Sequence, residues 1–268
     1  MEPSFVKIPQ EAKEMIKKEQ KLIFYEAETA SVFWETNIDV VKKLLPKPLK
    51  APKFPLATAF VGQWADTNFT YGYSESAIFL RAEFNGKYGN YCLGMHLDGP
   101  GKDMGQIYGR ELWGFPKKLA NIYYKHEGRK IYGWSQRHDT KNIELTIKLT
   151  GKPNDQDIDQ KMQELDALNP DARAYNFKRF PAPNGKGFDY KPWLTEVITE
   201  YRSDIIEVGE ANIKLKSSIH DPWAEVEIIR ILGGVYSRGT NTMVNGNVLT
   251  QVEEEEFLPY TFMNRDWF

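Results

Sequence analysis

The sequence has little of what disulfide, metal and nucleic-acid sites require. It contains a single cysteine, Cys92, which excludes an internal disulfide and any cysteine-rich metal centre. The formal net charge is only -2, so there is no electrostatic reason to expect nucleic acid or an anionic membrane as a partner. The four histidines show no ligand spacing. Nothing therefore argues for a metal, and we expect no cofactor.

Long apolar segments are also missing. No apolar run approaches the ~20 residues that a membrane-spanning helix needs, and residues 1–7 lack the apolar centre of a signal peptide. We therefore expect a protein of a reducing compartment, most simply the cytoplasm, with no membrane partner. Hydrophobic residues make up 41% of the chain and aromatic residues 13%, which predicts a sizeable core filled by bulky side chains.

The hydrophobic pattern predicts a β-rich chain. Connections between many of the apolar segments are far too short for a parallel crossover, which indicates antiparallel hairpins. No linker, repeat or low-complexity segment divides the chain. We predict one α+β domain over residues 1–268, with a curled, mostly antiparallel sheet that forms a cone- or barrel-like core and a few peripheral helices. The expected strands cover residues 23–35, 56–64, 77–84, 91–97, 119–126, 130–136, 143–150, 175–180, 193–201, 213–219 and 226–232.

Cap and turn residues add detail to this prediction. Asn37 is expected to cap a helix that Pro46 stops, and two further helices are predicted over 9–21 and 155–168. The dipeptide Asn245-Gly246 is the strongest short hairpin signal in the chain. The glycine-rich segment from Gly234 to Thr240 resembles a phosphate-binding loop but has threonine where that loop has lysine, so we interpret it as a turn.

Two adjacent lysines, Lys117 and Lys118, follow a Gly-Phe-Pro turn in an aromatic neighbourhood. Taken locally, the stretch fits a turn with two exposed cations. A lysine that must lose its proton near neutral pH instead needs such surroundings, since desolvation disfavours the ammonium form. No Gly-x-Ser-x-Gly or nucleotide motif occurs, which narrows the nucleophile candidates to these lysines. Glu75, before an apolar strand, is either a solvated loop acid or their carboxylate partner.

These residues carry a resemblance to the acetoacetate decarboxylase family that extends through most of the chain. Its most specific part is Gly-Arg-Glu-Leu at 109–112 followed by Phe-Pro-Lys-Lys-Leu at 115–119, and Tyr-Ser-Glu-Ser at 73–76 matches the segment that holds an active-site glutamate. The resemblance implies that Lys117 forms a Schiff base with a substrate ketone, with Glu75 and Lys118 as further catalytic residues. It also implies a homo-oligomer that acts on a small keto acid.

The chain departs from the family at two positions. Family decarboxylases have an arginine near the first strand and a second glutamate in the next, where this sequence has Ala27 and Phe60. Exchanging a buried ion pair for packing can be neutral for stability, and it leaves the pocket less able to hold a carboxylate through arginine. Trp113 and Phe115 are expected to complete this apolar pocket. A longer loop, Gly99 to Tyr108, also precedes the lysine motif.

Three functions remain open from the sequence. The first is a carbon–carbon lyase that decarboxylates acetoacetate or a related β-keto acid through an iminium and an enamine. The second is an aldolase–dehydratase that uses the same lysine on pyruvate and an aldehyde. The third is a non-catalytic small-molecule-binding module, against which the joint presence of Lys117, Lys118 and Glu75 argues. The aromatic segment 260–268 fits either a subunit contact or packing within the chain.

Overall fold

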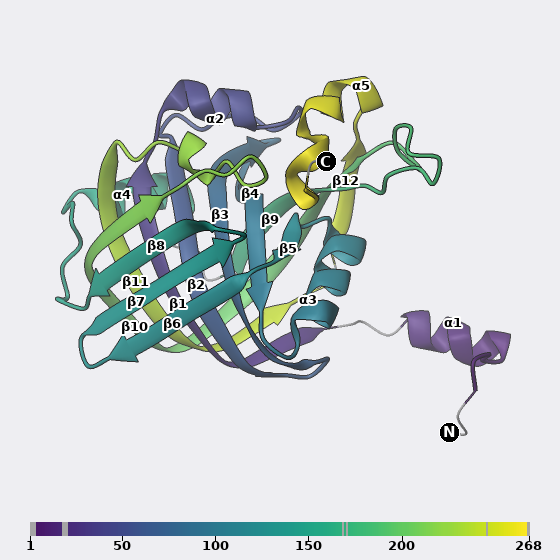
Figure 1. Ribbon diagram of the computed structural model, residues 1–268, viewed down its shortest axis with the longest axis horizontal. Helices are drawn as coiled ribbons and strands as arrows, with labels where there is room; N and C mark the ends of the chain where they lie inside the picture. Colours follow the sequence, from purple (N-terminus) through teal and green to yellow (C-terminus); the bar gives the residue numbers. More distant parts are fainter. Residues whose placement is uncertain (1–3, 18–20, 168, 170, 245, 267–268) are drawn as a thin grey trace.

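The structure is a computed structural model and describes residues 4–17, 21–167, 169, 171–244 and 246–266. Its centre is a curled 12-stranded sheet with a few short helices at its edges (Figure 1). Most strand pairs are antiparallel, so the predicted fold class is confirmed. The strands are β1 (Leu22–Glu35), β2 (Leu56–Thr67), β3 (Tyr71–Phe84), β4 (Lys87–Asp98), β5 (Lys117–Leu119), β6 (Asn121–Glu127), β7 (Lys130–Arg137), β8 (Thr140–Lys148), β9 (Asp171–Lys178), β10 (Trp193–Leu215), β11 (Arg230–Met243) and β12 (Asn247–Gln251).

Part of the sheet closes on itself into a barrel. Neighbouring strands follow the order β11-β1-β2-β3-β4-β9-β10, and β10 also pairs with β11, which joins the two ends of this series. The last residues of β10, 210–215, pair with β8 instead. β8, β7 and β6 therefore continue as a second layer, which covers the outer face of β1 and β2 (Figure 1).

Side-chain alternation divides the apolar residues between the two faces of the barrel strands. On the outer face, Val32, Val61 and Ile78 belong to the main core, together with residues of β7 and β8. Burying each such side chain stabilises the fold by about 1.5–3 kcal/mol. The inner face carries a smaller group, here called the interior cluster. Its buried members are Leu22, Phe24, Ala27, Trp64, Tyr73, Ala77, Cys92, Met95, Leu97, Trp113, Phe115 and Val197.

The helices lie at the ends and edges of the barrel. α2 (Ile38–Leu44) follows β1, and Asn37 caps it as predicted, since its side chain accepts a hydrogen bond from the backbone nitrogen of Asp39 at 2.9 Å. In the described part of the chain, no helix is long and apolar enough to cross a membrane. The other helical segments are α1 (Pro9–Lys17), α3 (Lys102–Tyr108), the π-helical η1 (Gly109–Trp113), α4 (Ile158–Glu164), the 3-10 turn η2 (Trp223–Glu225), α5 (Glu254–Phe257) and the 3-10 turn η3 (Leu258–Asn264).

Three predicted segments differ in extent from the structure. The helix predicted over 9–21 is found as α1, and residues 18–20 lie outside the described part of the chain. Of the helix predicted over 155–168, the described residues form only α4, which starts later because Asp155 accepts a hydrogen bond from the backbone nitrogen of Asp157 ahead of it; residue 168 lies outside the described part. The loop expected from Gly99 to Tyr108 contains α3.

The strands predicted from 23–35 to 175–180 each correspond to a strand of the sheet. The segments 193–201 and 213–219, however, are not separate strands, because one strand, β10, runs through both and ends at Leu215. Polar and exposed residues between them hide this continuity in the sequence. A bulge between Ser203 and Ile205 bends the strand, so that successive parts of β10 pair with different neighbouring strands.

Two predictions for the last third of the chain are wrong. The segment from Gly234 to Thr240 is not a turn but the middle of β11, where hydrogen bonds to β1 and β10 on both sides override the turn preference of glycine. The strand predicted over 226–232 is the start of β11, which begins only at Arg230. Asn245 lies outside the described residues, and β11 and β12 on either side both pair with β10, so they do not form the predicted hairpin.

Candidate active site

Lys117 and Glu75 form a buried ion pair inside the barrel. Lys117 is the first residue of β5, which pairs in parallel with β4 and places Lys117 in register with Met95. Glu75 lies on β3, on the other side of β4, in register with Leu97. The distance from Lys117 Nζ to Glu75 Oε1 is 2.5 Å, and the two residues are 5% and 6% exposed. The fold thus brings together the two residues that the family resemblance selects.

The turn before β5 positions Lys117. The π-helical η1 continues α3, and Gly114 ends it with a φ of 81°, a left-handed conformation that glycine adopts without strain. This reversal lets the chain return to pair with β4 at Lys117. Gly109 lies against the lysine side chain, because a Cβ at position 109 would be 2.5 Å from Lys117 Cδ and 3.0 Å from Nζ. The absence of a side chain at Gly109 leaves the space that the amine occupies.

The four residues predicted to line the pocket all belong to this interior. Ala27, Trp113 and Phe115 are buried members of the interior cluster, and Phe60 is partly buried against it. Lys117 Nζ lies 5.9 Å from the centroid of the Phe115 ring. Trp113 meets Phe115 edge-on, with ring centroids 6.5 Å apart. The Lys117–Glu75 pair is therefore enclosed by apolar and aromatic groups.

The low polarity of this interior raises the pKa values of three titratable groups within it. Burial, reinforced by the charge of Glu75, raises the pKa of Tyr73 well above its ordinary value and that of Tyr201 to about 12. Burial also raises the pKa of the Cys92 thiol, with a smaller and opposite influence from Lys117. All three groups are uncharged near neutral pH and lie within electrostatic reach of the ion pair.

Lys118 projects to the opposite face of β5, as strand alternation predicts. Its Nζ donates hydrogen bonds to Asp221 Oδ1 at 2.9 Å and to the backbone oxygen of His220 at 2.6 Å. The residue is 5% exposed. Its ammonium is thus held by a carboxylate outside the barrel, while that of Lys117 is held by Glu75 inside.

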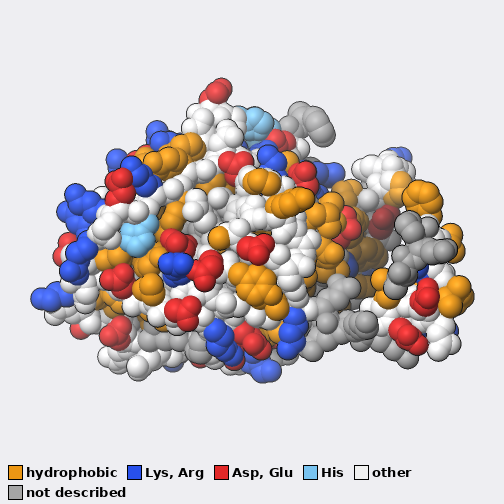
Figure 2. Space-filling view, turned by 90° about the horizontal axis from the view of Figure 1, so that it is seen from below, with side chains coloured by type: hydrophobic (Ala, Val, Ile, Leu, Met, Phe, Trp, Pro, Cys, Tyr) orange, Lys and Arg blue, Asp and Glu red, His pale blue; other side chains and the backbone are white. Residues whose placement is uncertain are grey.

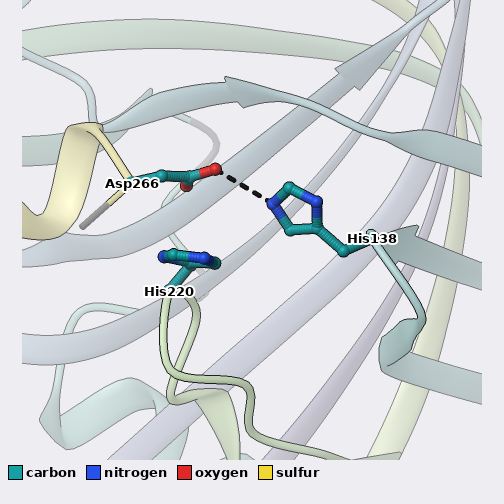
Figure 3. A group of neighbouring side chains, drawn as sticks. All are labelled: His138, His220 and Asp266. Carbon is teal, nitrogen blue, oxygen red and sulfur yellow. Dashed lines mark hydrogen bonds and ion pairs between the residues drawn. The ribbon is translucent and has the colours of Figure 1, made fainter. Parts of the chain in front are cut away.

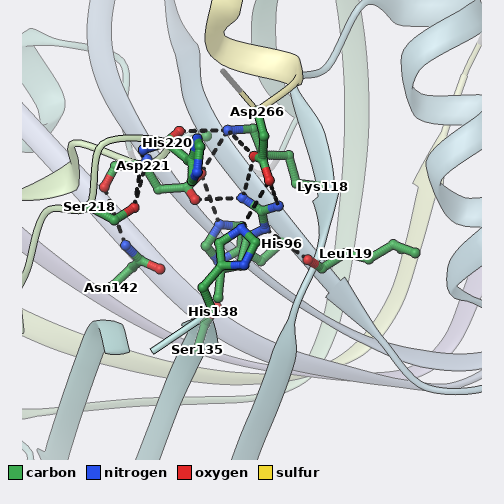
Figure 4. Close-up of polar contacts among 12 residues, drawn as sticks. His96, Lys118, Leu119, Ser135, His138, Asn142, Ser218, His220, Asp221 and Asp266 are labelled. Atoms are coloured by element: carbon green, nitrogen blue, oxygen red, sulfur yellow. Dashed lines mark hydrogen bonds and ion pairs between the residues drawn. The ribbon is translucent and has the colours of Figure 1, made fainter. Parts of the chain in front are cut away.

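Asp221 is the centre of a charged network on this outer face (Figure 4). Arg137 binds Asp221 Oδ2 at 2.6 Å, and His96 Nε2 lies 3.5 Å from Asp221 Oδ1. Burial alone would raise the pKa of Asp221, but the polar contact with His96 and the charge of Lys118 outweigh it and hold that pKa far below its ordinary value. Burial lowers the pKa of His96, whose ring is therefore neutral near pH 7.

His138, His220 and Asp266 also converge on this face, with possible ligand atoms within 4.8 Å of one another (Figure 3). The Asp266 carboxylate, however, already accepts hydrogen bonds from both terminal nitrogens of Arg137 at 2.9 Å. Lys118 Nζ lies 3.6 Å from the same carboxylate. Two cations beside it oppose the approach of a metal ion. We interpret the cluster as the ionic attachment of the C-terminal segment to the end of β7.

The C-terminal segment packs within its own chain as far as residue 266. Tyr260 packs against the main core and donates a hydrogen bond to the backbone oxygen of Lys43 at 3.2 Å. Arg179 donates to the backbone oxygen of Thr261 at 3.2 Å. Of the two interpretations of the aromatic segment, intrachain packing thus applies to these residues, while 267–268 lie outside the described part.

Sequence reasoning misses Asp221 and Arg137. Asp221 is 103 positions from Lys118 and 84 from Arg137, and no spacing pattern connects residues that only the fold brings together. Two surface cavities, of about 400 and 490 Å³, are also not apparent from the sequence. Neither is lined by Lys117 or Glu75, so the buried pair remains the candidate site on chemical grounds.

Comparison with known proteins points to one family. The family model for acetoacetate decarboxylase matches residues 8–252. The chain is 28% identical over 239 residues to the CLA biosynthesis isomerase of Lactiplantibacillus plantarum, covering 87% of this chain and 84% of that protein. It is 26% identical over 230 residues to acetoacetate decarboxylase 3 of Mesorhizobium japonicum, covering 84% of each. The crystal structure of acetoacetate decarboxylase from Legionella pneumophila has the same fold, with a TM-score of 0.73 and 20% identity over 87% of this chain and 88% of that one.

Proposed function

The chain belongs to the acetoacetate decarboxylase family, and on that premise we propose that it is a Schiff-base lyase that decarboxylates a β-keto acid through Lys117. The observation that carries the proposal is the enclosure of the Lys117 amine, 2.5 Å from Glu75, among the apolar side chains of the interior cluster. Acetoacetate decarboxylase is the established example of a lysine nucleophile activated by desolvation in an apolar pocket or by a second cation, and the apolar enclosure is the feature that Lys117 has in common with it. Curated relatives with that activity in their names support the assignment.

The residues of the site fit each step of this reaction. The neutral amine of Lys117 attacks the ketone carbon, and loss of water gives an iminium. The electron pair of the bond to the carboxylate moves toward the iminium nitrogen, so that carbon dioxide leaves and an enamine remains. Protonation of the enamine carbon and addition of water release the ketone and regenerate the amine. Glu75, hydrogen-bonded to Lys117 Nζ, is placed to take the proton that the amine must lose and to return one later.

Lys118 contributes to the reaction only by positioning in this proposal. Its ammonium is bound to Asp221 and to the backbone at His220, on the face of β5 that points away from the barrel interior. These bonds anchor β5, a strand of only three residues, and thereby fix the position of Lys117 at its start. We accordingly assign Lys117 and Glu75 as catalytic residues and Lys118 as a positioning residue.

Borohydride trapping tests the assignment of Lys117. Reduction in the presence of acetoacetate or a longer β-keto acid is expected to leave a covalent adduct on the peptide that contains Lys117, as read by mass spectrometry. Lys117→Met should give no adduct, and Glu75→Gln should form it more slowly. Lys125→Met, at a half-exposed lysine on β6, is the matched control and should behave as wild type. An adduct that survives in Lys117→Met, or its absence from wild type with every acid tested, would overturn the proposal.

A second candidate function is isomerisation of an unsaturated ketone on the same lysine. Ala27 and Phe60 supply no cation that could hold a substrate carboxylate, and the relative from Lactiplantibacillus plantarum bears the name isomerase. An iminium on Lys117 would acidify the adjacent carbon, and Glu75 could move a proton from one carbon to another without loss of carbon. Proton NMR in D₂O separates the candidates, because isomerisation shifts the double bond and incorporates deuterium without releasing carbon dioxide.

The aldolase–dehydratase alternative starts from the same amine and differs in the fate of the enamine, which adds to an aldehyde instead of being protonated. Pyruvate would form the iminium on Lys117, and its enamine would add to an aldehyde before loss of water. Incubation of the protein with pyruvate and an aromatic aldehyde, followed by chromatography, decides this alternative. A condensation product in wild type that disappears in Lys117→Met would favour it over decarboxylation.

We also propose that the chain forms a homo-oligomer, as members of the family do. Its N-terminal segment carries the exposed apolar side chains Phe5, Val6, Ile8 and Ile16. Figures 1 and 2 show α1 standing apart from the barrel at one end of the molecule. Apolar groups gathered on a projecting segment mark an interaction site. A second copy of the chain is the partner that this proposal names.

A further inference from the structure

The barrel interior contains polar groups without a hydrogen-bond partner. Asn176 of β9 is 1% exposed, and neither its Nδ2 nor its Oδ1 is hydrogen-bonded. Trp64 of β2 is 6% exposed, and its indole Nε1 also has no partner. A buried polar group without a partner destabilises the fold, so each such group requires an explanation. One such explanation is a bound ligand that supplies the missing hydrogen bonds.

Trp64 lies beside the Lys117–Glu75 pair. It is a member of the interior cluster and is in register with Tyr73 on β3, two residues before Glu75. Residues two apart on a strand share a face, so Trp64, Tyr73 and Glu75 all project into the barrel. The rings of Phe24 and Phe60 both pack against the indole, with centroids 5.5 and 6.1 Å from it.

Asn176 lies on the other side of the pair. It shares a face with Ala174, which packs against the interior cluster. β9 runs parallel to β4 with Tyr175 opposite Tyr91, so the next residues, Asn176 and Cys92, are neighbours on the two strands. Cys92 is within electrostatic reach of both members of the ion pair.

The backbone near Asn176 is satisfied while its side chain is not. Thr195 of β10, in register with Asn176, donates to the backbone oxygen of Trp113 at 2.7 Å and to that of Asn176 at 3.2 Å. The threonine thus ties β9 and β10 to the turn that precedes Lys117. It leaves the amide of Asn176 directed into the interior with both of its polar atoms available.

The kind of group that each residue can bind follows from its donors and acceptors. The indole N–H of Trp64 only donates, so its partner must be an acceptor, and the carboxylate of a β-keto acid is the acceptor that the reaction requires. The amide of Asn176 both donates and accepts, so its partner must do both, as a hydroxyl group does. Since the two residues lie on opposite sides of Lys117, these partners lie on opposite sides of the ketone.

We propose that Trp64 and Asn176 are substrate-binding residues of the Lys117 site and that the substrate is a hydroxylated β-keto acid. Trp64 hydrogen-bonds its carboxylate, and Asn176 hydrogen-bonds a hydroxyl group on the other side of the ketone. The chemistry on the ketone rests on the proposed function. The two binding contacts rest on the placement and the unpaired atoms of Trp64 and Asn176.

A matched pair of substrates tests this assignment. 5-Hydroxy-3-oxopentanoate and 3-oxohexanoate differ only in a hydroxyl group against a methyl group. Wild type is expected to favour the hydroxylated acid by roughly 100-fold in kcat/KM, since the analogue without a hydroxyl leaves the buried amide of Asn176 unpaired. Asn176→Leu should remove that preference while the Lys117 adduct still forms. Trp64→Phe should lower kcat/KM for both acids by about 10-fold and leave their ratio unchanged. A wild-type ratio near one, or a ratio unchanged in Asn176→Leu, would refute the proposal.

Binding and stability keep the test independent of the reaction. Calorimetric titration with the unreactive acids 5-hydroxypentanoate and hexanoate should show the same preference in wild type and its loss in Asn176→Leu. If wild type forms no borohydride adduct, the proposed function fails, but this binding preference still decides the present inference. Asn176→Leu should also raise the melting temperature, because it replaces unpaired polar atoms with apolar ones. A lower melting temperature would assign Asn176 a structural role and overturn the inference.

Discussion

Lys117 and Lys118 are adjacent in the chain, but their ammonium groups are bound by carboxylates on opposite faces of β5, Glu75 inside the barrel and Asp221 outside it. A strand directs successive side chains to opposite faces, so the two lysines do not share a site. The surroundings of Lys117 are set by the interior cluster, and those of Lys118 by a charged network. Substitutions can therefore separate reactivity from anchoring.

Lys118→Met should impair stability much more than Schiff-base formation. The substitution leaves the buried carboxylate of Asp221 without one of its cations, and breaking a buried ion pair costs about 3–5 kcal/mol. The free energy of unfolding, measured by urea denaturation, should fall by that order, while borohydride still traps the adduct on Lys117. A double-mutant cycle with Asp221→Asn should show strong coupling between the two sites. A Lys118→Met protein that is as stable as wild type but forms no adduct would contradict the anchoring of β5 by Lys118 and would indicate a direct part of Lys118 in the reaction.

Gly109→Ala should disable Lys117 without unfolding the protein. The new methyl group would lie 2.5 Å from Lys117 Cδ and would push the amine away from Glu75. A displacement of about 1 Å in a catalytic group can cost about 100-fold in rate, whereas overpacking costs about 1–3 kcal/mol of stability. Turnover and adduct formation should both fall, with thermal melting reporting the smaller loss of stability.

Gly133→Ala on β7 is the control for this experiment. Its methyl group would meet the Val61 side chain at 3.0 Å, on the face of β2 that points away from the barrel interior. It should therefore lower the melting temperature by a similar amount and leave turnover near the wild-type value. Equal loss of turnover in both variants would show that general overpacking, and not contact with Lys117, is responsible.

Acidification below pH 6.5 should destabilise the protein partly through His96. Burial lowers the pKa of His96, despite the nearby carboxylate of Asp221 and together with the charges of Arg137 and Lys118. Below about pH 6.5 the unfolded state therefore binds a proton that the folded state does not, and the free energy of unfolding decreases as the pH falls. Asp221 stays ionised in the folded state above pH 4.5, because its pKa is held far lower, so it adds little to this change.

His96→Phe is the variant that tests this origin. Phenylalanine retains a ring to stack on Trp223, whose centroid lies 4.4 Å from that of His96, and it removes the titrating group. The free energy of unfolding should then change less between pH 6.5 and 4.5 than in wild type, as measured by urea denaturation at each pH. The same slope in both proteins would exclude His96 as the source.

Deletion of residues 1–20 should reduce the size of the oligomer and leave the barrel folded. The deletion ends before β1 and removes the exposed apolar residues of the N-terminal segment. Light scattering coupled to size-exclusion chromatography should report a lower mass, and the melting temperature should stay within a few degrees. The milder variant Val6→Ser/Ile16→Ser should shift the mass in the same direction. An unchanged mass in both would remove this segment from the proposed contact.

Most strands from β1 to β9, the cap at Asn37 and the selection of Lys117 and Glu75 could be predicted from the sequence. Alternation and capping act between residues a few positions apart, so their signals are local. Lys117 and Glu75 could be selected for a different reason, because the motifs at 73–76 and 109–119 resemble those of a known family. Local information was insufficient for β10 and β11, where hydrogen bonds from distant strands decide the backbone conformation.

The sequence by itself thus determined a β-rich fold and selected Lys117 and Glu75 as the candidate site. Only the tertiary structure decided that these two groups meet, that Lys118 faces the other way toward Asp221, and that Asn176 is buried with an unpaired amide. Each of these facts depends on which strands become neighbours. Glu75 and Lys117 are 42 positions apart and Lys118 and Asp221 are 103 apart, and pairing across such distances is set by closure of the whole sheet.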